Sequence, residues 1–456
     1  MTEARERVHI VTHGCKVNQA DSDLIADAIA VRIGDRVLAG DDADATPGPA
    51  DDADVTPGAT DDPAVVVLNT CTVTAEADRK ARKAVRHALA LPSRPTVIVT
   101  GCLAALDPTG LRTLGKRVCV EPDRTQVAER VADLLNAGPA PEVSEPPSAR
   151  VPRRARVQVK VQDGCDARCS YCIVPQARGV ARSVPFDQVV AAVRHLAEAG
   201  VAEAVLTGVN IGKYDDAGRR LSHLLAAIGE TGIPRVRLSS IEPGDVDEAL
   251  LAVASSSPSF CRHLHIPLQS GCDRTLAAMD RPYDRRAFEA VLNSVRAALP
   301  GLAVSTDVIA GFPGESAVDA AESLAFVEHS GFSRLHVFRY SPRPGTRAAS
   351  HADQVAPAER SARARALREC GATLSERFAH ERLGATCELL VERCVDRAGR
   401  RCAEGTTREY VHVMAEVPGA EPGDLVQVNI SAVDAAGRVV GCPARWPNGI
   451  PAARAW

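Results

Sequence analysis

The sequence lacks a long apolar run and an apolar leader. Within its 456 residues no apolar stretch approaches the ~20 residues that a membrane-spanning helix needs. The opening segment, MTEARERVHI, is too polar for a secretory signal peptide. We therefore expect a cytoplasmic protein without a membrane partner. In that reducing compartment the 14 cysteines are expected to be metal ligands, nucleophiles or core residues, and a disulfide framework is not expected.

Basic and large apolar side chains are missing from one segment, residues 41–64. It reads DDADATPGPADDADVTPGATDDPA and contains eight Asp but neither Lys nor Arg. Such a composition cannot build a packed core, so we expect a disordered acidic insert. The formal net charge of the whole chain is -4, so the part of the chain outside this insert carries a net positive charge.

Three segments near the N-terminus share one pattern, in which an apolar run rich in β-branched residues leads through a polar or glycine turn to a cysteine. They are VHIVTHGC (8–15), AVVVLNTC (64–71) and TVIVTGC (96–102). Helical patterns follow at least the first two, and alternating strands and helices predict a parallel sheet. Since the carboxyl ends of parallel strands share one edge, we expect Cys15, Cys71 and Cys102 to meet there. This α/β domain is predicted to span residues 1–138, with Cys119 in its core.

The rest of the chain is predicted to form two further domains of an α/β protein. A Pro-rich linker (139–155) precedes six strand and helix repeats over residues 156–382, which predict a partial (β/α)6 barrel with its site at the carboxyl ends of the strands. Short alternating runs over residues 383–446 predict a small antiparallel β-domain. The six predicted barrel strands are RVQVKVQD, EAVLTGVN, RVRLSSIEP, RHLHIPLQSG, AVSTDVIAGFPG and RLHVFRYSPRPG.

Three cysteines, Cys165, Cys169 and Cys172, lie within QDGCDARCSYC after the first barrel strand. A helical stripe of core cysteines would need apolar neighbours, but Asp, Arg and Ser lie between them. A structural zinc site would need a second, distant pair of ligands, and none is evident. A cubane iron–sulfur cluster held by three thiolates suits the count, because its fourth iron stays open for a substrate or cofactor.

The C-x3-C-x2-C spacing with Tyr171 before the third cysteine resembles the motif of radical S-adenosylmethionine enzymes. The chain resembles the methylthiotransferases almost from end to end. KVNQ after the first cysteine and TCTVT at the second resemble the branch that acts on N6-threonylcarbamoyladenosine at position 37 of tRNA. The motifs that carry the resemblance are GCKVNQ, NTCTVTAEADRKAR, TGC, QDGCDARCSYCIVPQARG, LTGVNIG, LSSIEP, HLHIPLQSG, TDVIAGFPGE and VFRYSPRPGT.

This resemblance implies two 4Fe-4S clusters and S-adenosylmethionine as cofactors. Cys165, Cys169 and Cys172 would hold the catalytic radical cluster, and Cys15, Cys71 and Cys102 an auxiliary cluster. One S-adenosylmethionine would supply the methyl group, and a second the radical that removes hydrogen from carbon 2 of adenine. Glu242 and Asp307 could alternatively be ion-pair partners and not cofactor contacts. The other cofactor contacts implied are Tyr171, Thr207, Gly208, Asn210, Ser239, Glu242, Gln269, Asp307 and Gly311.

The implied partners are tRNA and a reductant such as flavodoxin or ferredoxin, and we expect a monomer with a C-terminal RNA-binding TRAM domain. Two alternatives stay open. One is a methylthiotransferase of the isopentenyladenosine or ribosomal-protein branch, and the other is a non-catalytic iron–sulfur RNA-binding protein. The chain departs from its relatives at CLAALDP, after the third cysteine. Basic residues that could contact phosphates are Arg79, Lys80, Arg82, Lys83, Arg86, Arg153, Arg154 and Arg156.

Overall fold

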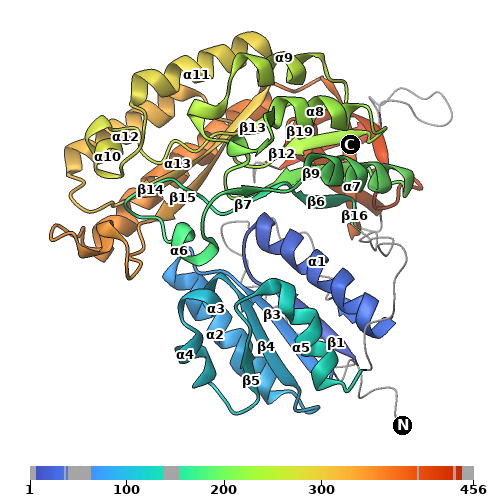
Figure 1. Ribbon diagram of the computed structural model, residues 1–456. Coiled ribbons are helices and arrows are strands. Elements are labelled where there is room, and N and C mark those ends of the chain that lie inside the picture. The colour runs from blue at the N-terminus through green and yellow to red at the C-terminus, as the bar shows by residue number, and fades with distance from the viewer. Residues whose placement is uncertain are drawn as a thin grey trace.

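The computed structural model describes residues 7–34, 37–39, 63–137, 154–397, 400–434 and 438–443. The acidic insert, except for its last two residues, and the linker up to residue 153 lie outside these ranges. Figure 1 shows an N-terminal α/β unit (blue), a central barrel (green to orange) and a C-terminal β-barrel (red). Within the described part, no helix has both the length and the apolarity to cross a bilayer.

The N-terminal unit is a five-stranded parallel sheet in the order β2-β1-β3-β4-β5, which confirms the parallel-sheet prediction. Every residue of β3 is buried because helices cover both faces, and this explains its continuous apolar run. Helices α1 and α5 pack on one face, and α2, α3 and α4 on the other. The elements are β1 (Val8–Thr12), α1 (Lys16–Ile33), β2 (Val37–Ala39), β3 (Val65–Thr70), α2 (Ala75–Ala90), β4 (Thr96–Gly101), α3 (Cys102–Leu106), α4 (Pro108–Arg112), β5 (Val118–Val120), η3 (Arg124–Gln126) and α5 (Val127–Leu134).

The central domain contains the six predicted parallel strands as two sheets, β6-β9-β12 and β13-β14-β15. Bridges between Val236 and Phe260 and between Ser240 and His265 join them into one arc. Among the described residues β15 does not pair with β6, so the barrel is partial. The strands are β6 (Arg156–Lys160), β9 (Glu203–Thr207), β12 (Arg235–Leu238), β13 (His263–His265), β14 (Ala303–Ala310) and β15 (Arg334–Arg339).

Helices and short ribbons connect these strands. A long apolar cluster lies between the strands and the outer helices. The helices are α6 (Val174–Arg178), α7 (Phe186–Glu198), α8 (Leu221–Gly229), α9 (Glu248–Ser256), α10 (Asp273–Ala278), α11 (Arg285–Ala298), α12 (Ala317–Ser330) and α13 (Pro357–His380), with η4 (Ile211–Lys213), η5 (Pro243–Asp245) and η6 (Arg347–Ser350). The ribbons are β7 (Gln162–Asp163), β8 (Arg182–Ser183), β10 (Asp215–Asp216) and β11 (Arg219–Arg220).

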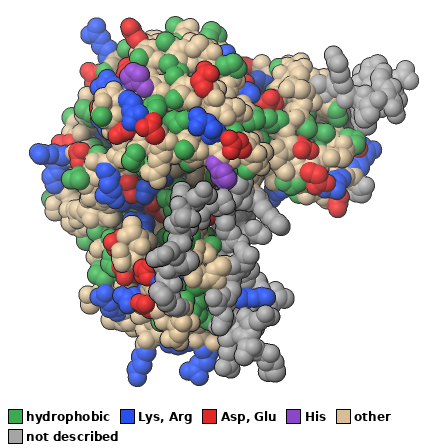
Figure 2. Space-filling model, turned by 45° about the vertical axis from the view of Figure 1, so that its right-hand side comes forward, with side chains coloured by type: hydrophobic (Ala, Val, Ile, Leu, Met, Phe, Trp, Pro, Cys, Tyr) green, Lys and Arg blue, Asp and Glu red, His purple; other side chains and the backbone are tan. Residues whose placement is uncertain are grey.

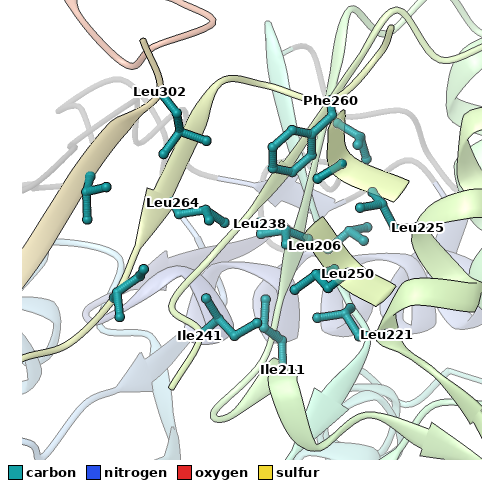
Figure 3. Close-up of a cluster of buried hydrophobic side chains, with 14 of the residues drawn as sticks. Leu206, Ile211, Leu221, Leu225, Leu238, Ile241, Leu250, Phe260, Leu264 and Leu302 are labelled. Atoms are coloured by element: carbon teal, nitrogen blue, oxygen red, sulfur yellow. The ribbon is translucent and has the colours of Figure 1, made fainter. Parts of the chain in front are cut away.

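The barrel strands alternate between an apolar outer face and a polar inner face. Leu206, Leu238 and Leu264 belong to the outer apolar cluster, where they meet residues of the surrounding helices (Figure 3). Their strand neighbours Glu203 and Arg237 lie on the opposite face and form a fully buried ion pair, with Nε to Oε1 at 2.7 Å. Branched apolar side chains usually fill the interior of a parallel barrel. The inner face of this barrel is therefore polar, and its buried charges are paired with one another.

The C-terminal domain is a closed five-stranded barrel in the order β16-β17-β18-β20-β19. Its neighbours are antiparallel as predicted, with the exception of the parallel pair β18 and β20. That pair arises because β19 separates the two strands in sequence, so that β20 returns beside β18 in the same direction. The strands are β16 (Thr386–Arg397), β17 (Arg400–Thr407), β18 (His412–Ala415), β19 (Leu425–Val433) and β20 (Val439–Pro443).

A turn of the C-terminal barrel closes the floor of the central barrel. Arg237 donates to the carbonyl of Thr407 at 3.1 Å, and Tyr410 stacks on His263 with ring centroids 4.7 Å apart. Arg156 lies over the Tyr410 ring and pairs with Glu392 at 3.1 Å. The prediction that Arg156 contacts phosphate is therefore wrong, since only 6% of its side chain is exposed.

Candidate functional site

Cys15, Cys71 and Cys102 lie together at the carboxyl edge of the N-terminal sheet. They follow β1, β3 and β4 at the points where the chain turns into helices or loops. The sulfurs of Cys15 and Cys102 are close enough to affect the pKa of Cys71 electrostatically. Burial, with these two neighbours, raises the pKa of Cys71 to about 12, so cluster binding at this site must release protons.

Two buried asparagines connect the segments of Cys15 and Cys71. Asn18 donates to the carbonyl of Thr70 at 3.0 Å, and Asn69 donates to the carbonyl of Asn18 at 2.8 Å. The Cys15 thiol donates to Asn18 Oδ1 at 3.3 Å. Gly101 has a φ of 92°, and a Cβ there would lie 2.4 Å from the Thr70 carbonyl oxygen, so only glycine fits this approach.

Cys165, Cys169 and Cys172 form a second group in the loop between β7 and α6. The backbone N–H of Ala167 donates to Cys165 Sγ at 3.4 Å, and Arg281 Nη1 donates to Cys169 Sγ at 3.1 Å. Burial raises the pKa of Cys172 to about 12. Gly164 opens the loop with a φ of 71°, because a Cβ there would lie 1.9 Å from the Val180 carbonyl oxygen.

A short helix, α6, separates the two groups of thiols. It begins two residues after Cys172 and ends at Arg178, whose guanidinium donates to Asn18 Oδ1 at 3.1 Å and pairs with Asp21 at 3.0 Å. Arg178 also pairs with Asp163 at 2.9 Å, so one buried cation connects the N-terminal unit to the barrel. The five residues of α6 span roughly 7.5 Å. Cys172 thus lies near the start of α6, and Cys15 and Cys102 lie near Arg178 at its end.

Three of the expected cofactor contacts have buried polar atoms without a hydrogen-bond partner in the described structure. They are Thr207 Oγ1, Asn210 Oδ1 and Ser239 Oγ, at the carboxyl ends of β9 and β12. Buried polar atoms are nearly always paired in folded proteins, and an unpaired one costs about 1–3 kcal/mol. Their chemistry fits the amino acid end of S-adenosylmethionine, which carries both donors and acceptors.

The other expected contacts divide between packing and charge pairing. Tyr171 packs edge-on against Phe312 with centroids 6.5 Å apart, and Gln269 holds a φ of 68° while its N–H donates to the Asp307 carbonyl at 2.8 Å. Cβ atoms at Gly208 and Gly311 would meet Gln162 O at 2.8 Å and Arg360 Cγ at 2.2 Å.

Glu242 and Asp307 both have side-chain partners in the described structure. Glu242 pairs with Arg281, and Asp307 Oδ1 lies 3.1 Å from His265 Nε2. The alternative role proposed from the sequence, that of an ion-pair partner, therefore describes Glu242, whereas the partners of Asp307 are histidines.

Several residues of the site were not expected from the sequence. Arg281, His265 and His336 each contact a predicted site residue and lie outside the cysteine motifs. Arg178 lies within the motif QDGCDARCSYCIVPQARG, and it contacts Asn18, which accepts from Cys15. The sequence signal that could have identified the histidines is the alternation of polar and apolar residues in HLH (263–265) and RLHVFR (334–339). This alternation places the histidines of each strand on the face toward the lumen.

The basic residues predicted to contact RNA differ in their surroundings. Arg79 and Lys80 on α2 are exposed, whereas Arg82 pairs with Asp107, and Arg154 pairs with Asp23 at 3.1 Å. Arg153 lies outside the described residues. On the face drawn in Figure 2, Lys and Arg side chains are interspersed with Asp and Glu.

Two family models match the chain. The radical SAM superfamily matches residues 159–327, and the uncharacterized protein family UPF0004 matches residues 51–120. The first match contains all three thiols of the barrel loop, and the second contains Cys71 and Cys102.

Curated relatives match over most of the chain. The chain is 32% identical to threonylcarbamoyladenosine tRNA methylthiotransferase MtaB of Thermotoga maritima, over 98% of this chain and 99% of the relative. It is 34% identical to MtaB of Bacillus subtilis, over 80% and 85%. It is also 31% identical to tRNA-2-methylthio-N(6)-dimethylallyladenosine synthase of Sphingopyxis alaskensis, over 94% and 96%.

Among solved structures, the fold is similar to that of the radical S-adenosylmethionine methyltransferase TsrM from Kitasatospora setae. The TM-score is 0.54 at 16% identity, with 75% of this chain and 77% of that chain covered. The TsrM structure contains cobalamin and a [4Fe-4S] cluster. This likeness supports the central barrel as a radical SAM fold.

Proposed function

This chain belongs to the MtaB-like radical S-adenosylmethionine methylthiotransferases, and we propose that it converts N6-threonylcarbamoyladenosine at position 37 of tRNA to its 2-methylthio derivative. The reaction would use two molecules of S-adenosylmethionine. The observation that carries the proposal is the pair of three-cysteine groups on either side of α6. Either group of cysteines alone would be sufficient for an ordinary iron–sulfur protein. Two adjacent groups suit a reaction in which a sulfur-containing group is joined to a radical.

The two groups are proposed to have different roles. Cys165, Cys169 and Cys172 would hold the cluster that supplies one electron to S-adenosylmethionine, and Cys15, Cys71 and Cys102 would hold the auxiliary cluster. Unpartnered Thr207, Asn210 and Ser239 would bind and orient the methionine end of the cofactor. Buried Arg281, beside Cys169, would offset the negative charge of the thiolates.

The proposal also includes the tRNA substrate and a small reductant such as flavodoxin or ferredoxin. Relatives at nearly equal identity act on either threonylcarbamoyl- or dimethylallyl-adenosine by their names. The branch assignment therefore depends on KVNQ and TCTVT and on the polar lumen. The predicted domain bounds 1–138, 156–382 and 383–446 remain part of the proposal, as does the monomeric state.

The first prediction separates the two clusters. After anaerobic reconstitution the wild type should contain about eight irons per chain, and Cys71→Ala and Cys165→Ala about four each. Cys165→Ala should lose formation of 5'-deoxyadenosine, whereas Cys71→Ala should retain it and lose methylthiolation. Cys119→Ala, which alters a partly buried core thiol, is the control and should keep both activities. Full methylthiolation by Cys71→Ala would contradict the two-cluster assignment.

The substrate is tested in the cell. Mass spectrometry of tRNA nucleosides from a deletion strain should show loss of 2-methylthio-N6-threonylcarbamoyladenosine and recovery upon complementation. Loss of the isopentenyl analogue instead would assign the chain to the other tRNA branch. An unchanged nucleoside profile, together with no cleavage of S-adenosylmethionine, would favour a non-catalytic iron–sulfur protein.

A further inference from the structure

The polar lumen contains a continuous chain of hydrogen-bonding groups across β13, β14 and β15. Ser305 Oγ lies 2.8 Å from both His263 Nε2 and His265 Nδ1. His265 Nε2 and His336 Nδ1 lie 3.1 and 3.2 Å from Asp307 Oδ1. The rings of His265 and His336 also stack, with centroids 5.2 Å apart. These five side chains therefore fix one another in place.

The chain is buried at one end and open at the other. His263 is only 3% exposed on the barrel floor, while the side chains of Asp307 and His336 are 23% and 36% exposed. The described structure gives Asp307 Oδ2 no partner, because both histidines use Oδ1. A ligand in the lumen can thus reach a free carboxylate oxygen and one imidazole.

The open end lies close to the radical loop. Ile309 follows Asp307 by two residues on the same face of β14, a rise of roughly 6.6 Å. Ile309 packs against the same small apolar cluster as Tyr171, which lies between two of the cluster cysteines. The backbone of Asp307 is tied to Gln269 at 2.8 Å. A base whose reacting carbon faces the radical loop would therefore place its exocyclic substituent near this cluster.

The charges of Asp307 and His336, at the open end of the chain, follow from their surroundings. Although burial favours the protonated acid, His265 and His336 hold the pKa of Asp307 below its ordinary value, so the carboxylate is ionised. Burial lowers the pKa of His336, so its ring is neutral at pH 7. Arg334 precedes His336 by two residues on β15, so it is level with Ser305, one layer deeper in the lumen and near Tyr410, and it is half-buried. It has no acidic partner in the described part of the chain.

We propose that Asp307, His336 and Arg334 recognise the N6 substituent of the substrate base, an inference that rests on the proposed function. Asp307 accepts from the N–H groups of a urea-like substituent, His336 hydrogen bonds with its polar oxygens, and Arg334 pairs with its carboxylate. The three groups together match a substituent that has both N–H donors and a negative charge.

The same surface disfavours an apolar substituent. A prenyl group would displace water from Asp307 and His336 without offering a hydrogen bond, and an unsatisfied buried polar group costs about 1–3 kcal/mol. The lumen therefore selects a polar N6 group over an isoprenoid one. The choice of substrate then depends on Asp307, His336 and Arg334, which lie outside the cysteine motifs.

The test measures binding of three anticodon stem-loop RNAs that carry threonylcarbamoyl-, isopentenyl- or unmodified adenosine at position 37. Fluorescence anisotropy on the reconstituted holoenzyme should show the first bound about 10-fold or more tightly than the other two. Arg334→Gln and His336→Phe should each remove most of this preference, while affinity for the unmodified RNA stays within about 2-fold. RNA-independent formation of 5'-deoxyadenosine should persist in Arg334→Gln.

Arg365→Gln, an exposed position on α13, is the matched control and should keep the preference. Retention of the full preference by both Arg334→Gln and His336→Phe would overturn the inference. The proposed function fails separately, if the wild type methylthiolates only the isopentenyl RNA.

A metal ion is the competing occupant of these side chains. Atoms of His265, Asp307 and His336 lie within 4.8 Å of one another, as ligands of one ion would. Titration of the holoenzyme with Co2+ should produce no visible d–d bands that depend on His336. Appearance of such bands with one ion per chain, and their loss in His336→Gln, would overturn recognition of the substituent.

Discussion

At the residue scale, Asn18 links the segments of Cys15 and Cys71 to the central barrel. It is fully buried, and its side chain contacts the segments that follow β1 and β3 as well as Arg178 of the barrel. An amide is suited to this place because it both donates and accepts. An aliphatic side chain at position 18 would leave the Thr70 carbonyl and the Arg178 guanidinium short of one partner each.

We predict that Asn18→Ala loses the auxiliary cluster but keeps the radical cluster. Iron should fall from about eight to about four per chain, and formation of 5'-deoxyadenosine should continue. Iron analysis and chromatography of the cleavage product measure these outcomes. Asn293→Ala, on the exposed face of α11, should retain all the iron. Full iron content in Asn18→Ala would show that the three thiols are positioned without the amide.

At the element scale, the strands of the central barrel bury charge on the inner face. Glu203 on β9 lies between Arg235 and Arg237 on β12, at 2.8 and 2.7 Å, and all three side chains are fully buried. Both arginines also donate to the Thr407 carbonyl of the C-terminal barrel. The Glu203 carboxylate thus compensates the positive charge of the two arginines that connect the central barrel to the C-terminal barrel.

Glu203→Gln is predicted to destabilise the protein by about 3–5 kcal/mol, because it leaves buried guanidinium charge uncompensated. Burial alone would raise the pKa of Glu203, but Arg237 and Arg235 hold it below its ordinary value. The stabilisation by Glu203 is therefore present above the ordinary carboxyl pKa and is lost as the pH falls through the folded-state pKa. Denaturation at pH 7 and pH 4 measures the difference, which should be larger at pH 7. Exposed Glu230→Gln should change stability by less than about 0.5 kcal/mol.

At the scale of the whole molecule, Arg178 sets the relation between the N-terminal unit and the barrel. Its side chain is 2% exposed and contacts Asp21 and Asn18 on α1 and Asp163 in the barrel. Lys160 pairs with the same Asp21 at 2.6 Å. A misplacement of about 1 Å between reacting groups can reduce a rate about 100-fold, so this contact bears directly on methylthio transfer.

Arg178→Met should uncouple the two halves of the reaction. We expect both clusters to assemble and 5'-deoxyadenosine to form, while methylthio product per 5'-deoxyadenosine falls about 10-fold or more. The ratio of the two products in one reaction mixture is the measurement. Arg182→Met removes a neighbouring arginine whose side chain is 60% exposed and should preserve the ratio. An unchanged ratio in Arg178→Met would mean that other contacts align the domains.

The sequence by itself determined the fold class, the six parallel strands and both groups of cysteines. These features depend on local patterns: β-branched apolar runs that end in turns, alternating polarity, and close spacing of thiols. The same locality explains the two errors. Arg156 was interpreted as a surface cation because its burial depends on Glu392 and Tyr410 far along the chain. The parallel pair β18 and β20 depends on how the barrel closes.

Only the tertiary structure decided how these parts act on one another. Arg178, Arg281 and the His265, Asp307 and His336 cluster contact residues that are between 29 and 160 positions away in sequence. The motifs that contain Arg178, His265 and Asp307 do not identify their partners, because a long-range ion pair requires only that folding bring complementary charges together. The cysteine spacing therefore indicated the chemistry, whereas the packing of the strands decided which side chains line the inner face of the barrel.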